Sequence, residues 1–279
     1  MHKPDMSLWI GSSEIQDARL DLSTAQKFTA TVGDPIVNDG DPMPHLAHWC
    51  AFPPSVAMAK LSSDGHPKLG GFLPPVDLER RMWAAGSLEF HAPLHIGTTI
   101  TRHSKIKAIS EKEGAAGPMV FVTVAHELYD GETHAISETQ DIVYLNIPDT
   151  FSPPSPKPTP SAPDLCEPVK MSEALLFRYS AATFNAHRIH YDLPYAQQVE
   201  KYPGLVVHGP LQATLLIQAA MRHANRTPRT FSFRGIHPIF HFDDLHLFGQ
   251  NTKDGMTLCT GLIGGHQGMQ AKIIWEDTE

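Results

Sequence analysis

The chain has 279 residues, of which 41% are hydrophobic and 19% are charged, and its formal net charge at pH 7 is -8. This length suits two domains of about 100–150 residues each, and the composition excludes a largely disordered chain. The negative charge, without any block of basic residues, excludes a surface for nucleic acid or for an anionic membrane.

The chain lacks the apolar runs that signal peptides and membrane-spanning helices need. Its three cysteines, Cys50, Cys166 and Cys259, are scattered along the sequence. An odd number of cysteines without CxxC spacing does not fit a disulfide framework. These features predict a cytoplasmic protein with reduced thiols.

The first half is predicted to begin with helices and to continue as strands. A helix is expected over residues 22–34, where Ser23 can cap the N-terminus and Gly33 can stop the helix. Strand-like patterns follow in residues 84–110, 119–132 and 134–147.

Prolines recur every few positions in residues 149–168. Proline fixes φ and removes a backbone donor, so this stretch is predicted to be a semi-rigid, polyproline-like linker. It divides the chain into a first unit, 1–148, and a second unit, 169–279. A long surface loop within one domain is the alternative, and the similar lengths on both sides disfavour it.

The second half repeats the order of the first. A helix is expected over 171–185 with Ser172 as its N-cap, and a second over 208–225 that is apolar on most sides and is therefore predicted to be buried. Strands are expected in residues 229–240, 244–252, 256–264 and 269–277. Helices followed by antiparallel strands in each half predict an α+β fold.

Polar residues that suit acid–base chemistry gather in FNAHRIHYDLPYA, residues 184–196. Asn185 and His190 are five positions apart, and His208 and Gly209 open the predicted buried helix. Histidine exchanges protons near neutral pH, and a helix start with glycine offers free N–H groups to a developing oxyanion. The combination predicts proton transfer beside a site for enolate charge.

The string FNAHRIHYDLPYA, followed by GLVVHGPLQATLL, resembles the MaoC-like, R-specific enoyl-CoA hydratases, whose general motif is D-x-N-P-x-H-x-D with a later H-G. The resemblance implies a double hot dog fold, in which each of two units is a long buried helix wrapped by an antiparallel sheet. ERRMWAAGSLEFHAPLHIGTTITRHSKI and FRYSAATFNAHRIHYD are more closely similar to a two-domain subgroup. That subgroup includes the mesaconyl-C4-CoA and itaconyl-CoA hydratases and the mitochondrial 3-hydroxyacyl-thioester dehydratases.

Carried over by position, the resemblance implies that His190 is the catalytic histidine and that Gly209 supplies the oxyanion N–H. Asn185 stands where the family has a catalytic aspartate, and an amide can orient a water but cannot take its proton. We therefore expect Asn185 to position the water and His190 to transfer the proton, with His187 as an alternative second base. The first unit has no counterpart of these residues, and we expect it to be catalytically degenerate and to help form the substrate pocket.

Four residues are candidates for binding the substrate: His187, Arg188, His208 and Arg234. Arg188 suits either a substrate carboxylate or a structural salt bridge. Arg234 belongs to a group of arginines that suit either the phosphates of coenzyme A or the C-terminal end of the buried helix. His208 also suits a structural cap beside Gly209.

No metal site is expected, because neither the pair His187 and His190 nor the pair His45 and His48 has the i, i+4 spacing of a metalloprotease helix. Asp192 is expected to cap a short helix that begins at Leu193.

The resemblance implies a reversible hydratase of α,β-unsaturated or branched enoyl-CoA thioesters that needs no cofactor besides the coenzyme A of its substrate. Itaconyl-CoA or mesaconyl-C4-CoA, giving citramalyl-CoA, is the favoured substrate, and a homodimer is expected. Three alternatives stay open: a dehydratase of linear 3-hydroxyacyl thioesters, a hot dog thioesterase and a non-catalytic acyl-CoA-binding module. Asn185 at the aspartate position disfavours the thioesterase, which needs a carboxylate to activate water.

Overall fold

The computed structural model describes residues 5–114 and 117–276. Residues 1–4, 115–116 and 277–279, which belong to the two predicted units, lie outside the described part, and so does the end of the predicted last strand at Asp277. The strands are β1 (Ser13–Arg19), β2 (Arg80–Phe90), β3 (Thr99–Gly114), β4 (Gly117–Asp130), β5 (Thr133–Leu145), β6 (Leu165–Pro168), β7 (Pro228–Gly235), β8 (Leu245–Asn251), β9 (Gly255–Leu262) and β10 (Gln267–Trp275). The α-helices are α1 (Leu22–Val32), α2 (Glu173–Thr183), α3 (Leu193–Gln198) and α4 (Gly209–Ala224), and the 3-10 helices are η1 (Met6–Trp9), η2 (Ala47–Cys50), η3 (Met58–Lys60) and η4 (Arg188–His190).

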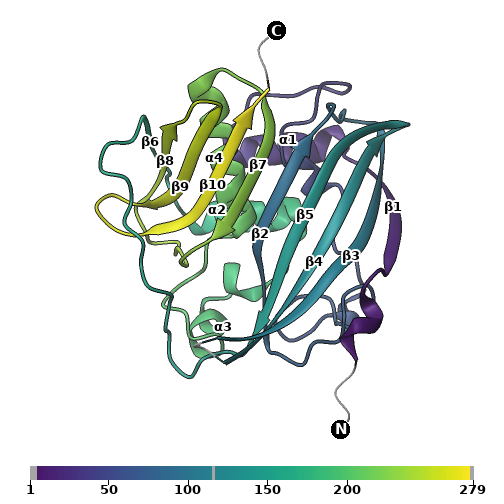
Figure 1. Cartoon of the computed structure of the whole chain (residues 1–279), viewed down its shortest axis with the longest axis vertical. Coiled ribbons are helices and arrows are strands. Elements are labelled where there is room, and N and C mark those ends of the chain that lie inside the picture. The colour runs from purple at the N-terminus through teal and green to yellow at the C-terminus, as the bar shows by residue number, and fades with distance from the viewer. Residues whose placement is uncertain (1–4, 115–116, 277–279) are drawn as a thin grey trace.

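The strands form a ten-stranded sheet in the order β1-β3-β4-β5-β2-β7-β10-β9-β8-β6 (Figure 1). The strands of the first half occupy one side of the sheet and those of the second half the other. The two sides meet where β2 pairs antiparallel with β7, from Ala85 opposite Arg234 to Glu89 opposite Thr230. This is the α+β arrangement of strands and helices that the sequence predicted.

Two strands of the sheet were not predicted from the sequence. The first, β1, is mostly exposed and polar, so it shows no apolar alternation and is held by backbone pairing with β3. The second, β6, falls in the predicted linker but pairs with β8 at the edge of the sheet. Pro168 is tolerated there because it ends an edge strand.

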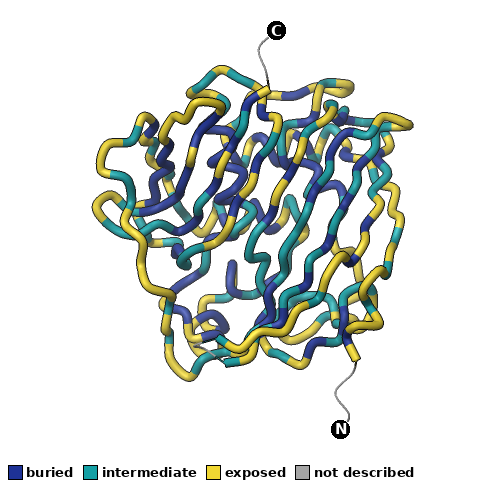
Figure 2. Tube along the Cα trace, viewed as in Figure 1, coloured by how far each residue is buried: buried dark blue, intermediate teal, exposed yellow. Residues whose placement is uncertain are grey.

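The rest of the predicted linker runs along the outside of the second half, mostly exposed (Figure 2). It is nevertheless bound to the turn between β9 and β10. The amide of Gln267 donates to the carbonyl of Lys157 at 2.8 Å, and the amide of Thr159 donates to the carbonyl of Gly265 at 3.1 Å. The stretch is therefore anchored to the second half for part of its length.

The helix caps follow the sequence with one correction. Ser172 caps α2 as predicted, since its hydroxyl accepts a hydrogen bond from the amide of Leu175. At α1 the cap is Asp21 rather than Ser23, because the carboxylate accepts from the amide of Thr24 and also suits the positive end of the helix dipole. Gly33 ends α1 in the left-handed region, as expected.

The second half contains the long buried helix that the resemblance implied. Residues 211–220 of α4 are all buried, and the helix packs on the strands of the second half. Among the described residues, no helix has the length and apolarity needed to cross a membrane.

The first half departs from the expectation of a second such helix, since its longest described helix, α1, has 11 residues. The segment that parallels the start of α4 contains Pro74 and Pro75, and it stays irregular because proline removes backbone donors. Its neighbours Leu73 and Val76 pack instead against the apolar face of β4 and β5.

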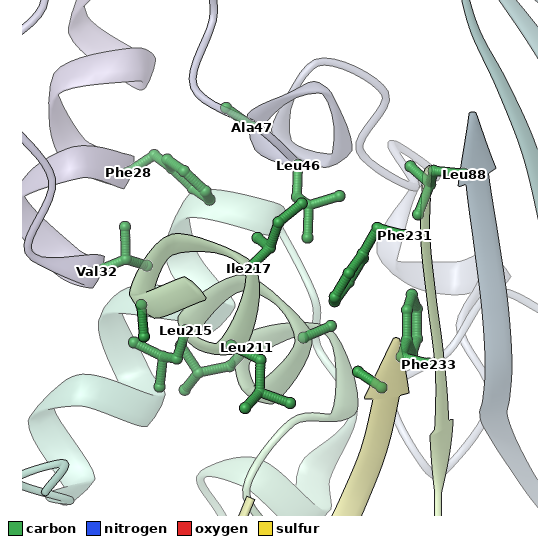
Figure 3. Close-up of a cluster of buried hydrophobic side chains, with 14 of the residues drawn as sticks. Phe28, Val32, Leu46, Ala47, Leu88, Leu211, Leu215, Ile217, Phe231 and Phe233 are labelled. Atoms are coloured by element: carbon green, nitrogen blue, oxygen red, sulfur yellow. The ribbon is translucent and has the colours of Figure 1, made fainter. Parts of the chain in front are cut away.

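The core joins the two halves around α4 (Figure 3). Leu211, Leu215 and Ile217 of α4 belong to the same buried cluster as residues of α1, η2, β2 and β7. The labelled members outside α4 are Phe28 and Val32 of α1, Leu46 just before η2, Ala47 of η2, Leu88 of β2, and Phe231 and Phe233 of β7. Burial of each large side chain contributes about 1.5–3 kcal/mol, so both halves fix the position of α4 and of its first residue.

Candidate active site

The polar motif begins where α2 ends. Phe184 takes the left-handed conformation (φ 52°), which turns the chain out of the helix. The motif then passes through η4, and Asp192 caps α3 by accepting from the amide of Tyr195 at 3.1 Å, as predicted. The stretch between the two helices therefore holds its side chains on a short, anchored loop.

His190 is buried and has a defined tautomer. Its Nδ1 atom lies 2.7 Å from the carbonyl oxygen of Val206. Because a carbonyl only accepts, Nδ1 carries the proton and Nε2 keeps its lone pair. Burial, followed by the neighbouring His208 and His187, holds the pKa of His190 well below its ordinary value. The imidazole is therefore neutral at neutral pH and can accept a proton through Nε2.

His208 supports His190 from the start of α4. The two rings stack with centroids 3.6 Å apart at an angle of 18°, and His208 Nε2 lies 2.8 Å from the hydroxyl of Ser180. Its Nδ1 atom is buried without a hydrogen-bond partner among the described residues. The ring therefore packs as a neutral imidazole behind His190, and a contact of His208 with substrate remains a prediction.

The buried state of His208 predicts acid-sensitive stability. Burial lowers the pKa of His208 from 6.5 to about 3. Between these pH values His208 is therefore protonated in the unfolded chain but not in the folded chain. The free energy of unfolding should fall by about 2 kcal/mol from this group alone between pH 7.5 and pH 5. Urea denaturation at pH 7.5 and pH 5 measures the fall in the free energy of unfolding. That fall should be about 2 kcal/mol smaller in His208→Gln than in the native protein. Equal losses in both proteins would contradict the assignment.

Gly209 is the first residue of α4, where backbone N–H groups have no partner within the helix. A Cβ atom there would meet only ordinary contacts, the carbonyl of Trp83 at 3.7 Å and the methyl of Met269 at 3.8 Å. The surrounding protein therefore does not require glycine at this position. The missing side chain leaves the N–H open to a ligand, as an oxyanion donor needs.

Asn185 is oriented by its own loop. Its Oδ1 atom accepts a hydrogen bond from the amide of His187 at 3.0 Å, and this fixes which end of the side chain is oxygen. The group left to reach a water or a substrate is the NH₂ group, which only donates. The role of Asn185 in positioning water remains a prediction. In that role, Asn185 would act by donating a hydrogen bond from its NH₂ group.

A chain of buried polar contacts that sequence reasoning missed lies behind the motif. His187 Nε2 is 3.1 Å from Oε1 of Glu200, and Oε2 of Glu200 accepts from Arg80 Nε at 2.8 Å. Burial raises the pKa of Glu200, but the hydrogen bond and charge of His187 together with Arg80 outweigh it and lower the pKa overall. Arg80 belongs to β2, so the first half contributes a charge to the surroundings of the motif.

A turn of the first half also touches the motif directly. The amide of Arg188 donates to the carbonyl of Asp64 at 2.9 Å, and the ring of His66 lies 4.2 Å from the ring of His187. Asp64 accepts from His66 Nδ1 at 2.7 Å. Asp64, His66 and His187 offer metal-ligand atoms within 4.8 Å of one another, but these side chains already bind each other or Glu200.

The other predicted histidine pair has separate surroundings. His48 Nε2 lies 2.9 Å from the buried carboxylate of Glu138, which also accepts from Trp49, while the ring of His45 packs on Phe90. These contacts are structural, and they separate the pair from the motif in the second half.

Arg188 is engaged by the protein. Its Nη2 and Nε atoms donate to Asp192 at 2.7 and 3.0 Å, its Nη1 atom donates to the carbonyl of Ser63, and the guanidinium lies 4.0 Å from the ring centre of Tyr195. These contacts favour the structural salt bridge over a substrate clamp. Arg234 lies in an exposed position on β7, and its contact with coenzyme A remains a prediction.

A cavity of about 390 Å³ borders the same turn of the first half. Its walls come from both halves, with His66, Leu69 and Tyr144 on one side and Tyr195 and Val199 on the other. The first half therefore shapes open space beside the motif.

Of the predicted residues, the structure gathers Asn185, His187, Arg188, His190, His208 and Gly209 around the ends of α2 and the start of α4. The partners that prediction missed, Asp64, His66, Arg80 and Glu200, carried one signal in the sequence, the turn-forming Asp-Gly before His66. Nothing local connects Arg80 with Glu200.

The fold and the site together define an enzyme of the hydratase and dehydratase class with a double hot dog fold. The chain belongs to the hydroxyacyl-thioester dehydratase type 2 family, whose model matches residues 46–241. This confirms the resemblance seen in the sequence.

Curated relatives and solved structures agree. The chain is 42% identical to the mesaconyl-C(4)-CoA hydratase of Chloroflexus aurantiacus over 92% of this chain and 93% of that protein. It is 29% identical to the mitochondrial hydroxyacyl-thioester dehydratase type 2 of Schizosaccharomyces pombe over 69% of this chain and 73% of that one. Its fold matches a MaoC-like dehydratase from Phytophthora capsici with a TM-score of 0.73, at 13% identity and 96% coverage of each chain. A Mycobacterium tuberculosis protein described as a double hotdog fold matches with a TM-score of 0.57, at 14% identity, over 95% of this chain and 96% of that one.

Proposed function

We propose that the protein is a hydratase that adds water reversibly to an enoyl-CoA thioester, with mesaconyl-C4-CoA or itaconyl-CoA giving citramalyl-CoA. The observation that carries the reaction type is the buried, neutral His190, whose Nε2 atom keeps its lone pair and whose ring stacks on His208 at the start of α4, where the N–H of Gly209 has no partner within the helix. The identity of 42% over nearly the whole length of a mesaconyl-C(4)-CoA hydratase supports the substrate.

The proposed addition uses groups of the chain and no metal or redox cofactor. The thioester oxygen accepts from the N–H of Gly209, and His190 Nε2 takes a proton from the attacking water. In mesaconyl-C4-CoA, whose C2–C3 double bond is conjugated with the thioester, the water oxygen bonds to C3 and the electrons of that double bond move toward the carbonyl as an enolate. His190 Nε2 then gives to C2 the proton that it took from water, and dehydration follows the same path in reverse.

A dehydratase of linear 3-hydroxyacyl thioesters is the second candidate, supported by the family model and by the yeast relative. The same groups would serve it, because hydration and dehydration share one transition state. A homodimer is proposed from the resemblance to the family.

Purified protein incubated with mesaconyl-C4-CoA, itaconyl-CoA and crotonyl-CoA in EDTA should add the mass of one water to a thioester, as followed by mass spectrometry. Preference for mesaconyl-C4-CoA or itaconyl-CoA would support the favoured substrate, and preference for crotonyl-CoA would support the second candidate. Release of free coenzyme A would instead identify a thioesterase. Binding without turnover would leave a non-catalytic module.

A further inference from the structure

The first half, expected to be catalytically degenerate, carries two sets of groups that reach the catalytic motif. Arg80 forms a buried ion pair with Glu200, in which the two side chains are 7% and 1% exposed. Arg80 Nη2 also donates to the backbone carbonyl of Glu200 at 2.6 Å. A buried pair of this kind is fixed in place, because removing one partner leaves the other charge unpaired.

The second set is the turn Ser63–His66, which contacts the motif itself at His187 and Arg188. The amide of Arg188 donates to Asp64, Arg188 Nη1 donates to Ser63, and the ring of His66 lies against that of His187. His187 is therefore held between His66 of the first half and Glu200, which Arg80 of the first half anchors.

His187 in turn contacts His190. The two rings meet edge to face, with centroids 5.5 Å apart at 85°, while His208 stacks on His190 at 3.6 Å. The titratable groups around His190 are thus three imidazoles, those of His208, His187 and His66. The charged groups next to these imidazoles are Glu200 and Asp64, which are negative, and Arg80 and Arg81, which are positive, while Arg188 is paired with Asp192.

We propose that the first half is part of the catalytic apparatus: Arg80 and the Asp64–His66 turn are positioning groups that act through Glu200 and His187 to fix how readily His190 takes a proton. This inference rests on the proposed function for its kinetic test. It assigns the first half a role in proton transfer in addition to a role in shaping the pocket.

Electrostatics gives the proposal a signature that a purely structural role lacks. Glu200 favours protonated His190 and Arg80 disfavours it, so removing the two charges should have opposite effects. In Glu200→Gln the pH at which His190 becomes protonated should fall, and in Arg80→Gln it should rise. The double variant should lie between the two.

The test measures the acid side of the pH profile of kcat/KM in both variants, below the melting temperature of each. The titration of the His190 ring is followed in parallel by NMR, with assignment from His190→Asn. Arg222→Gln is the matched control, because it also removes a positive charge that is paired with a glutamate, Glu167 at 2.9 Å, but at the last turn of α4 and not beside the histidines of the site. It should leave the titration of His190 unchanged.

Opposite shifts in the two variants would support the proposal. If both variants lose activity while the titration of His190 shifts in the same direction in both, or does not shift, the proposal is overturned. If the buried pair cannot be changed without unfolding, Asp64→Asn takes its place, because the carboxylate of Asp64 is partly exposed. This variant should shift the titration of His190 in the same direction as Glu200→Gln. The absence of that shift would overturn the proposal. The NMR titration needs no substrate, so its outcome stands even if no enoyl thioester is turned over.

Discussion

Replacement of His190 by alanine is expected to lower kcat for hydration about 10²–10⁴-fold, the range that a positioned general base contributes. The reason is the arrangement of its two ring nitrogens. Nδ1 is committed to the carbonyl of Val206, so Nε2 is the nitrogen that can take the proton of water. Asn185 cannot replace it, because an amide does not accept a proton from water and its oxygen is already bound to the amide of His187.

His190→Asn separates the position of the ring from its chemistry. The asparagine NH₂ group can still donate to Val206 in place of Nδ1, but it offers no basic nitrogen. The loss of kcat should therefore be similar to that of the alanine variant, while the melting temperature stays closer to that of the native protein. His223→Ala, at an exposed position near the end of α4, is the control and should keep full activity. Retention of more than about a tenth of the native kcat in both His190 variants would assign the proton to another group.

Local sequence was sufficient for the parts of the site that depend on neighbours in the chain. Ser172 and Asp192 were predicted as caps because capping needs only the next three residues. The buried helix that starts after His208 was predicted from its apolar residues on most sides. Together these elements fix the relative places of His190 and Gly209, so the candidate site could be proposed from the second half alone.

The contributions of the first half could not be predicted in the same way. Arg80 and Glu200 are 120 positions apart, and a buried ion pair leaves no periodic pattern in the sequence around either residue. The absence of a long helix at this place in the first half has a local sign in Pro74 and Pro75, whereas the expectation of two equal units came from the resemblance. Similarly, β1 is a polar edge strand whose pairing depends on the exposed backbone of β3.

Gly65→Ala is expected to lower both stability and activity, although it lies in the first half. Gly65 has φ +94°, a conformation that residues with a side chain rarely adopt, and a Cβ atom there would overlap the carbonyl of Ala186 in the catalytic motif. The turn would have to move away from the motif. The hydrogen bond from Arg188 to Asp64 and the contact of His66 with His187 would then be lost. The free energy of unfolding should fall by about 2–4 kcal/mol, and kcat/KM should fall at least about tenfold.

Gly70→Ala separates backbone strain from the loss of this contact. Gly70 has nearly the same backbone angle, φ +95°, but the nearest atom to an added Cβ would be that of Pro75 at 3.8 Å, an ordinary distance. This variant should lose about 1–2 kcal/mol of stability from strain alone and keep its activity. Urea denaturation and initial rates of hydration measure both quantities. If the two glycine variants lose the same stability and the same activity, the turn at Gly65 does not hold the motif; if the loss of activity is confined to Gly65→Ala, the close approach of the first half to Ala186 is what keeps His187, and through it His190, in place.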